Sequence, residues 1–206
     1  MRSIGGAMVA CALIVSGCSF HNVIYNSQRL YTEAEVHRRA GRESLSTARY
    51  LDVIRKTGQA LSSRPDSEWA DEALFLLGRS RLRLRALREA RVALEAALER
   101  TDDPRLRSEI LVYLAMVQTD LGDGQGALER VSELPTSALT DGPRAEAHLL
   151  RARILLAASP SDQGWWELDR ASAADPATRV EVGLERLRWA IAHGDEGRSH
   201  KAFKVL

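Results

Sequence analysis

A spacing of 37 residues recurs along this chain and constrains its fold more than any other feature. Small residues stand at Gly78, Ala115 and Ala152, each after a leucine-rich segment. Self-similarity at a fixed period of about 20–50 residues is typical of stacked supersecondary units. Further small or apolar residues follow each of the three at offsets of twelve, sixteen and nineteen: Ala90, Ala127, Gly164; Leu94, Val131, Leu168; Ala97, Leu134, Ala171.

Each repeat is predicted to be a pair of helices. No stretch alternates polar and apolar residues as a half-buried strand does. Small residues at the helix crossing let two backbones approach, and the apolar residues four and seven positions later fill the seam. Pro65 and Asp175-Pro176 fall where a second helix should end, and Gly122-Asp123-Gly124 forms a turn within a pair. Because neither helix can bury its apolar stripe alone, the pairs must stack.

The sequence therefore predicts an all-α, helix-pair repeat solenoid of about four to five units over residues 27–206. In the first unit Ala34, Gly41 and Ala48 keep part of the pattern, and the second helix extends to Ser63. In the last unit Leu184, Leu187 and Ile191 suggest a first helix. Residues 194–206 are short and polar, so they form either a cap or a truncated repeat.

Composition supports this fold class and excludes some functions. Hydrophobic residues make up 45% of the chain and aromatic residues 5%, which favours a helical domain with a sizeable core. The 29 Lys and Arg residues nearly balance the 28 Asp and Glu residues, which argues against nucleic acid as a partner. The only cysteines are Cys11 and Cys18, so the predicted domain has no disulfide, cysteine zinc site or cysteine nucleophile.

The N-terminus has the features of an export signal. Met1-Arg2 is followed by an apolar run from Ile4 to Val15, which is too short for a permanent membrane span. The next residues, Val15-Ser16-Gly17-Cys18, resemble the bacterial lipobox. That resemblance implies a signal peptide over residues 1–17, a lipid on Cys18 and a tether over residues 18–26. The alternative is a buried helix that carries an ordinary cysteine.

The lipobox resemblance also implies a cellular location. Lipoproteins of this kind carry at least two acyl chains, and each buried CH₂ contributes about 0.8 kcal/mol, so the anchor would be permanent. An Asp after the lipidated cysteine retains such proteins at the inner membrane, whereas this chain has Ser19. We therefore expect the protein at the outer membrane, facing the periplasm, if its source has two membranes.

The repeat itself resembles the tetratricopeptide repeat. Shared features are a Leu followed by a small residue in the first helix, then Ala in the second helix, an apolar residue four later and a closing Pro. The resemblance covers residues 27 to about 200. The segment Tyr25 to Glu35 (Tyr-Asn-x-x-x-Leu-Tyr-x-x-Ala-Glu) and the Arg64-Pro65-Asp66-Ser67 junction are similar to BamD-like (YfiO) lipoproteins of outer-membrane β-barrel assembly.

The sequence offers no arrangement typical of a catalytic or metal site. Its histidines (His21, His37, His148, His193 and His200) have no metal-ligand spacing, so we predict no metal, no cofactor and no enzymatic activity. The glycine-rich run after Gly122 lacks the strand and lysine of a phosphate loop and is predicted to be a turn. Asp102-Asp103 and Asp195-Glu196 are interpreted as helix caps rather than acid–base pairs.

Two features remain as candidate binding surfaces. Trp165-Trp166 is either an exposed binding feature or, as we favour, one packed and one half-exposed tryptophan. Stripes at offsets of three, four and three along the first helices predict a partner-binding groove with an acidic, an apolar and a basic row. Alternatively, these charges pair with one another along a solvated face. The groove residues are Glu72, Phe75, Arg79, Leu82, Glu109, Val112, Met116, Glu146, Leu149, Arg153 and Leu156.

Together these features favour a lipid-anchored scaffold that binds other envelope proteins or peptides, possible roles being envelope or β-barrel protein assembly. A second hypothesis is an accessory or ligand-binding module of the peptidoglycan machinery, for which clustered aromatic residues in the groove would be expected.

Overall fold

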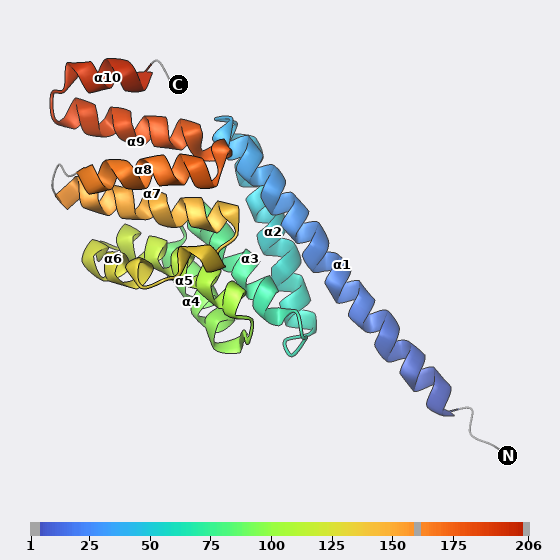
Figure 1. Ribbon diagram of the computed structural model, residues 1–206. Coiled ribbons are helices and arrows are strands. Elements are labelled where there is room, and N and C mark those ends of the chain that lie inside the picture. Colours follow the sequence, from blue (N-terminus) through green and yellow to red (C-terminus); the bar gives the residue numbers. More distant parts are fainter. Residues whose placement is uncertain (1–4, 159–161, 204–206) are drawn as a thin grey trace. The chain divides into compact units, whose positions relative to one another are not determined.

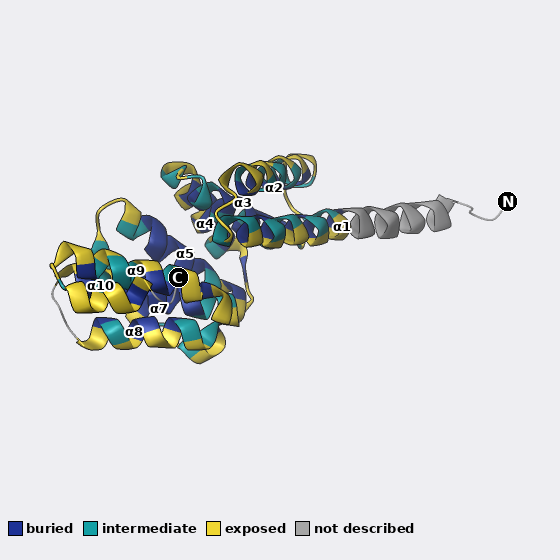
Figure 2. Ribbon diagram, turned by 90° about the horizontal axis from the view of Figure 1, so that it is seen from above, coloured by how far each residue is buried: buried dark blue, intermediate teal, exposed yellow. Residues whose placement is uncertain are grey.

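The computed structural model describes residues 5–158 and 162–203, with side chains from Phe20 onward, and these residues are almost entirely helical. The helices pack as adjacent antiparallel pairs, which confirms the predicted all-α helix-pair fold (Figure 1). The chain divides into two compact units, residues 1–101 and residues 102–206. Figure 2 shows the buried residues on the helix faces that meet within each unit.

The first unit contains two helix pairs. Helix α1 (Gly5–Arg39) packs along α2 (Glu43–Ser63), and α3 (Ala70–Arg83) packs along α4 (Leu87–Arg100). Helices α2 and α3 also contact each other, so the pairs stack. The break between the pairs includes Pro65, as predicted from the sequence.

The second unit contains three helix pairs. These are α5 (Pro104–Asp120) with α6 (Gly124–Ser132), α7 (Asp141–Ala158) with α8 (Asp162–Ala174), and α9 (Arg179–Ala192) with α10 (Glu196–Phe203). Short 3₁₀ turns at Thr136–Ala138 and Pro176–Thr178 connect successive pairs. Because α6 contacts α7 and α8 contacts α9, these pairs are stacked in sequence order.

The 37-residue spacing marks the crossing of the two helices in the α3–α4, α5–α6 and α7–α8 pairs. Ala115, Ala152, Ala90 and Ala127 are completely buried, as are Leu94, Val131 and Leu168 further along the second helices. A Cβ atom on Gly78 would lie 2.6 Å from Leu94 Cγ, and one on Gly164 would lie 2.6 Å from Leu156 Cγ. The predicted reason for small residues at these positions, a close approach of the two helices, is confirmed.

The α1–α2 pair also has small residues at its helix crossing, but the residue on the second helix is Ser46 and not the predicted Ala48. Ala34 is completely buried, and Ser46, twelve residues later, is also buried. Ala48, which the sequence analysis placed in the pattern, is exposed. The offset of twelve, rather than the alanine itself, identifies the residue at the crossing, because the helix period decides which side chain faces the partner helix.

The turns inside four of the pairs share one backbone conformation. Gly41, Arg85, Gly122 and Gly194 have φ angles of 68°, 62°, 101° and 65°. In each turn the N–H of this residue bonds to the carbonyl three residues back, and the next N–H bonds to the carbonyl five residues before its own position. A left-handed residue that ends a helix in this way satisfies its last carbonyls. These four residues therefore define equivalent positions in the repeats.

Residues 18–26, which were expected to form a tether, are part of helix α1. The helix continues through this segment, and Phe20 and Ile24 are 4% and 2% exposed in a core cluster with Tyr31 and Tyr50. The inner stripe of α1 extends upstream of residue 27, since Phe20, Ile24 and Tyr31 share one face at helical spacing. The folded domain thus includes residues that the sequence analysis assigned to a linker.

The predicted signal peptide and lipidation site fall largely outside the described residues. The structure describes no part of residues 1–4 and no side chain before Phe20, so lipidation of Cys18 stays a prediction. Within the part of the chain that the structure describes, no helix combines the length and apolar character that a membrane span requires.

Candidate functional site

The apolar row of the predicted groove is not an open surface. Each of its residues is at most 8% exposed, and the acidic side chain of Glu146 is buried with them. The prediction of an exposed apolar row is therefore wrong. The buried members are Phe75, Leu82, Val112, Met116, Leu149 and Leu156.

The stripe of α7 is buried because it faces α9, the first helix of the next pair. In the second unit, Leu149 and Leu156 of α7 and Leu168 of α8 share a core cluster with Val182 of α9. In the first unit, Tyr31 of α1 and Tyr50 of α2 share a cluster with Ala73 and Leu76 of α3. In α7 the stripe that periodicity identified is thus the contact between stacked pairs.

The charged members of the predicted groove take different positions. Glu72 and Glu109 are half-buried, and Glu109 Oε1 accepts a hydrogen bond from Thr140 Oγ1 at 2.7 Å. The guanidinium of Arg79 lies over the rings of Tyr31 and Phe75, with its Cζ 3.8 Å and 4.9 Å from their centroids. Such cation–π contacts hold Arg79 against its own unit rather than in solvent.

Arg153 is the predicted groove residue that reaches solvent. Its side chain is 41% exposed, and its Nε donates to Glu185 Oε1 of α9 at 2.8 Å. Arg188 Nη1 donates to the same oxygen at 3.1 Å. These three residues form an Arg–Glu–Arg cluster that connects α7 and α9. Arg153 is therefore ion-paired, but with the largely buried Glu185 of α9 and not, as the alternative predicted, with a Glu of the same rows along a solvated face.

A hollow of about 240 Å³ lies beside this cluster, between α7 and α9. The indole of Trp189 stacks on the imidazole of His193 with their centroids 4.1 Å apart and an interplanar angle of 15°. Trp165 of α8 contacts the other side of this group, its ring edge-on to Trp189. We call this site the α7–α9 hollow; its lining residues are Arg153, Leu156, Ala157, Glu185, Arg188, Trp189, Ala192 and His193.

The sequence analysis found two of the residues at this hollow, Arg153 and Leu156, and missed the contribution of α9. A signal was present. Counting back from the turn residue Gly194 gives Glu181, Leu184, Arg188 and Ile191, which repeat the acidic, apolar, basic and apolar stripe of α7. The repeat step into α9 is two residues shorter than 37, so a search at a fixed period does not align this helix.

A buried ionic network lies in the first unit. Glu35 of α1 accepts from Arg83 Nε of α3 at 2.9 Å and from Arg38 Nη2 at 2.8 Å, and it also accepts the hydroxyl hydrogen bond of Tyr50. Burial alone would raise the pKa of Glu35, but Arg83 and Arg38 hold that pKa well below its usual range. Burial and the neighbouring carboxylate raise the pKa of Tyr50. The network connects α1, α2 and α3.

The second unit has a smaller buried pair. His148 Nδ1 of α7 lies 2.5 Å from Glu167 Oε2 of α8, and Arg170 Nη1 donates to Glu167 Oε1 at 3.2 Å. Burial opposes ionisation of Glu167, whereas His148 and the nearby arginines lower its pKa below the usual value. The pair connects the two helices of one repeat.

The remaining sequence interpretations concern loops and aromatic residues. Asp103 and Asp195 accept from backbone N–H groups of α5 and α10, so they act as caps. Asp123 does the same for α6. The predicted turn is confined to Gly122 and Asp123, because Gly124 and Gly126 already belong to the first turn of α6. Trp165 is half-buried and Trp166 is 63% exposed, as the favoured interpretation predicted. Among the described residues, no group of three or more His, Cys, Asp or Glu side chains is placed to hold a metal ion.

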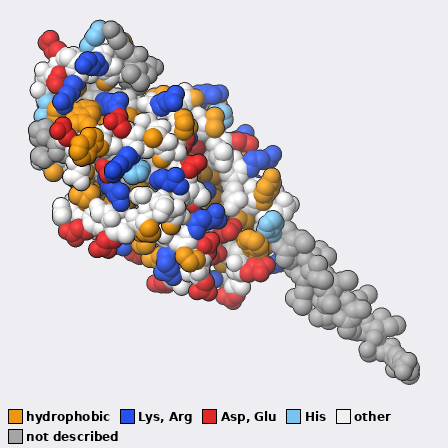
Figure 3. Space-filling model, in the orientation of Figure 1, with side chains coloured by type: hydrophobic (Ala, Val, Ile, Leu, Met, Phe, Trp, Pro, Cys, Tyr) orange, Lys and Arg blue, Asp and Glu red, His pale blue; other side chains and the backbone are white. Residues whose placement is uncertain are grey.

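The surface carries both signs of charge. On the face shown in Figure 3, blue Lys and Arg side chains and red Asp and Glu side chains are interspersed, with orange apolar side chains between them.

Comparison with known proteins adds support for the fold. No protein-family model matches the chain, and no curated protein matches it. Among solved structures, BtubC (BKLC) from P. vanneervenii is similar, with a TM-score of 0.56, 16% sequence identity, and coverage of 94% of this chain and 91% of that chain. At this identity the likeness concerns the fold alone.

Proposed function

We propose that this chain is a non-enzymatic, lipid-anchored repeat adaptor that binds partner proteins or peptides at the outer membrane, facing the periplasm. The observation that carries the binding role is the α7–α9 hollow. There the exposed Arg–Glu–Arg cluster borders a stacked Trp–His pair, and the residues come from two successive helix pairs. An apolar surface for contact area, bordered by charges that orient the ligand, is typical of peptide recognition.

The chemistry of the hollow favours a peptide with a carboxylate. Arg188 is 72% exposed and Arg153 is 41% exposed, so both guanidinium groups have donors that a ligand can reach. Arginine binds carboxylates through paired N–H donors. The stacked rings of Trp189 and His193 line the hollow beside these donors.

Charge reversal tests this site. Arg153→Glu together with Arg188→Glu should abolish recovery of a cross-linked partner from detergent-solubilised membranes. Arg91→Glu on α4, whose side chain is 55% exposed, is the matched control and should leave recovery unchanged. Full recovery with the double variant, at unchanged helicity by circular dichroism, would refute the role of the hollow. Recovery of barrel-assembly components would support the assembly role that the resemblance to BamD-like lipoproteins implies.

The anchor has a structural consequence. Phe20, two residues after Cys18, is already a core residue. Two residues rise about 3 Å in a helix such as α1, and even a fully extended pair would span only about 7 Å. A lipid on Cys18 would therefore hold the first unit directly against the membrane surface instead of on a long tether.

Cys18→Ala tests the anchor. The variant should lose lipid labelling and should leave the membrane fraction or remain unprocessed. Cys11→Ala, in the same N-terminal segment, should change neither property. Lipid labelling and membrane association that persist in Cys18→Ala would contradict the proposal.

A second candidate function is favoured by the aromatic group. The sequence analysis expected clustered aromatic residues in a glycan-binding surface. Trp189 and His193 line the hollow, and Trp165 lies edge-on to Trp189. Co-sedimentation of the full chain with purified peptidoglycan distinguishes the candidates. Saturable binding that competes with soluble glycan fragments supports the cell-wall role, whereas its absence leaves the protein-binding proposal.

A further inference from the structure

The α9–α10 pair exposes residues that are buried at the equivalent positions of the other pairs. Phe203 is nine residues after the turn residue Gly194, just as Leu94 follows Arg85 and Val131 follows Gly122. Leu94 and Val131 are completely buried, whereas Phe203 is 70% exposed.

Two residues of α9 are likewise exposed although their equivalents in α3 are buried. Ile191, three residues before its turn, is 66% exposed, whereas the equivalent Leu82 of α3 is 3% exposed. Leu184, ten residues before its turn, is 40% exposed, whereas the equivalent Phe75 is 5% exposed. Three positions that form the core elsewhere are thus open on this pair.

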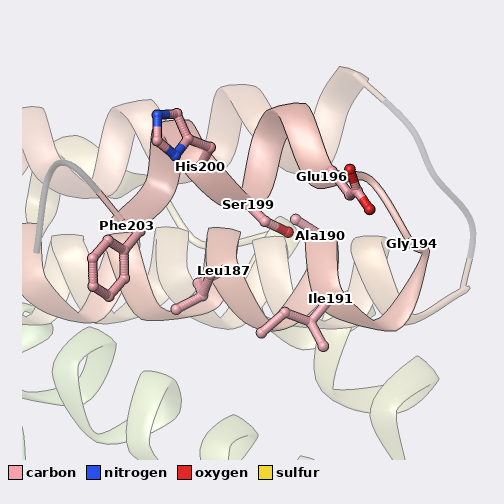
Figure 4. A pocket seen from close by; sticks show the side chains of 8 residues that line it. All are labelled: Leu187, Ala190, Ile191, Gly194, Glu196, Ser199, His200 and Phe203. Carbon is pink, nitrogen blue, oxygen red and sulfur yellow. The ribbon is translucent and has the colours of Figure 1, made fainter.

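Ile191 and Phe203 border a hollow of about 520 Å³ (Figure 4). Leu187, Ile191 and Phe203 lie along one side of it, and α10 contributes Ser199 and His200. We call the surface formed by Leu184, Leu187, Ile191 and Phe203 the α9–α10 face. No described residue of the chain covers it.

The interior of the molecule shows what covers such a face. Over the α7–α8 pair the cover is α9, whose Val182 packs with Leu149 and Leu168. Over the α1–α2 pair the cover is α3. In both units, therefore, the occupant is an amphipathic helix, the first helix of the next pair.

The charges specify the occupant further. Over the α7–α8 pair, Glu185 of the covering helix accepts from Arg153 at 2.8 Å. Arg188 directly follows Leu187 in α9, just as Arg153 directly follows Ala152 in α7, and it is 72% exposed. A helix on the α9–α10 face would place its acidic residue beside Arg188.

We propose that the α9–α10 face is a docking site for an amphipathic helix of a partner protein. That helix carries an apolar residue, an acidic residue three positions later and a large apolar or aromatic residue four positions after that, as Val182, Glu185 and Trp189 do in α9. The helix adds one more layer to the stack and buries Leu184, Ile191 and Phe203. This inference goes beyond the adaptor role and does not depend on the lipid, although it shares Arg188 with the α7–α9 hollow.

The test uses a labelled peptide with the sequence of residues 176–193, because α9 is the molecule's own example of a covering helix. Fluorescence anisotropy with the full chain should show saturable binding. Ile191→Ser combined with Phe203→Ser should weaken binding at least tenfold. Val92→Ser on α4, whose side chain is 63% exposed, is the matched control and should have no effect. Arg188→Glu should weaken binding, and a peptide with Lys in place of Glu185 should restore it.

Several results would overturn the proposal. One is the absence of peptide binding, and another is binding that the double serine variant leaves unchanged. A third is self-association of the full chain, without peptide, that the double variant removes, because a second copy would then be the occupant. Arg153→Glu alone changes the α7–α9 hollow and should not weaken peptide binding, whereas Ile191→Ser with Phe203→Ser changes only the α9–α10 face. These variants, rather than Arg188→Glu, separate failure of one proposal from failure of the other.

Discussion

At the scale of single residues, Gly78 shows how closely the paired helices approach. A methyl group there would lie 2.6 Å from Leu94 Cγ and 3.2 Å from the Leu94 backbone nitrogen. Because Leu94 is completely buried and its backbone cannot move freely, we expect Gly78→Ala to destabilise the protein by about 1–3 kcal/mol, as overpacking does. Chemical denaturation measures this change.

Gly58 provides the matched control for Gly78. It lies within α2, and a Cβ atom there would have no neighbour within 4 Å. Gly58→Ala should therefore stabilise the protein by about 0.5–1 kcal/mol, because alanine favours the helix. Equal effects of the two substitutions would show that intrinsic helix propensity, and not the crossing, decides the result.

The buried carboxylate of Glu35 should contribute strongly to stability. Removing one partner of a buried ion pair costs about 3–5 kcal/mol, so Glu35→Gln should destabilise the protein by that order at pH 7. The pKa of Glu35 is lower in the folded protein than its unfolded value of about 4.3. Its contribution is therefore present above that pH and is lost as the pH falls toward the folded pKa.

Unfolding free energies of the wild type and Glu35→Gln should consequently converge as the pH is lowered from 5 to 3. The exposed Glu95, 3.8 Å from Arg91, is the control, and Glu95→Gln should change stability by less than about 1 kcal/mol. A difference between wild type and Glu35→Gln that stays constant over this pH range would contradict the buried ion-pair network.

At the scale of elements, substitutions at two equivalent turn residues, Gly122 and Arg85, should change stability in opposite directions. Gly122 has a φ of 101°, so Gly122→Ala should destabilise the protein by about 1 kcal/mol although the site has room for a methyl group. Arg85 has a φ of 62° without being glycine. A left-handed conformation costs such a residue about 1–2 kcal/mol, so Arg85→Gly should be neutral or stabilising. Thermal unfolding of both variants checks the signs, and destabilisation by Arg85→Gly would show that its side chain matters more than the turn.

The sequence predicted the helix pairs well because the small residues at the helix crossings recur at a regular spacing in the sequence. Gly78 and Ala90 fix one crossing, and the same offset of twelve holds for Ala34 and Ser46. The last pair was less predictable, since Leu187 stands where a small residue is usual and the step to α9 is shorter.

The candidate site was less predictable than the fold for a physical reason. Periodicity identifies the face of a helix that is apolar, but it contains no information on what covers that face. Leu149 and Leu184 occupy equivalent positions, yet one is 1% and the other 40% exposed. The same limit explains why residues 18–26 were expected to form a tether, because only packing shows that Phe20 and Ile24 are core residues.

At the scale of the whole molecule, each unit has a core of its own. The core cluster of the first unit is formed by α1, α2 and α3, and a separate cluster in the second unit is formed by α7, α8 and α9. In stacked repeats, stability is approximately a sum of terms between neighbours. A substitution in one core should therefore act locally.

Hydrogen exchange of the full chain tests this locality. Glu35→Gln removes the carboxylate that connects α1 to Arg83 of α3, so amide protection should fall in α1, α2 and α3. Protection in α7, α8 and α9 should stay within about twofold of the wild type, because their cluster contains none of the residues that Glu35 contacts. A parallel loss of protection in all six helices would instead show that the chain unfolds as one cooperative body, and neighbour terms would then not describe its stability.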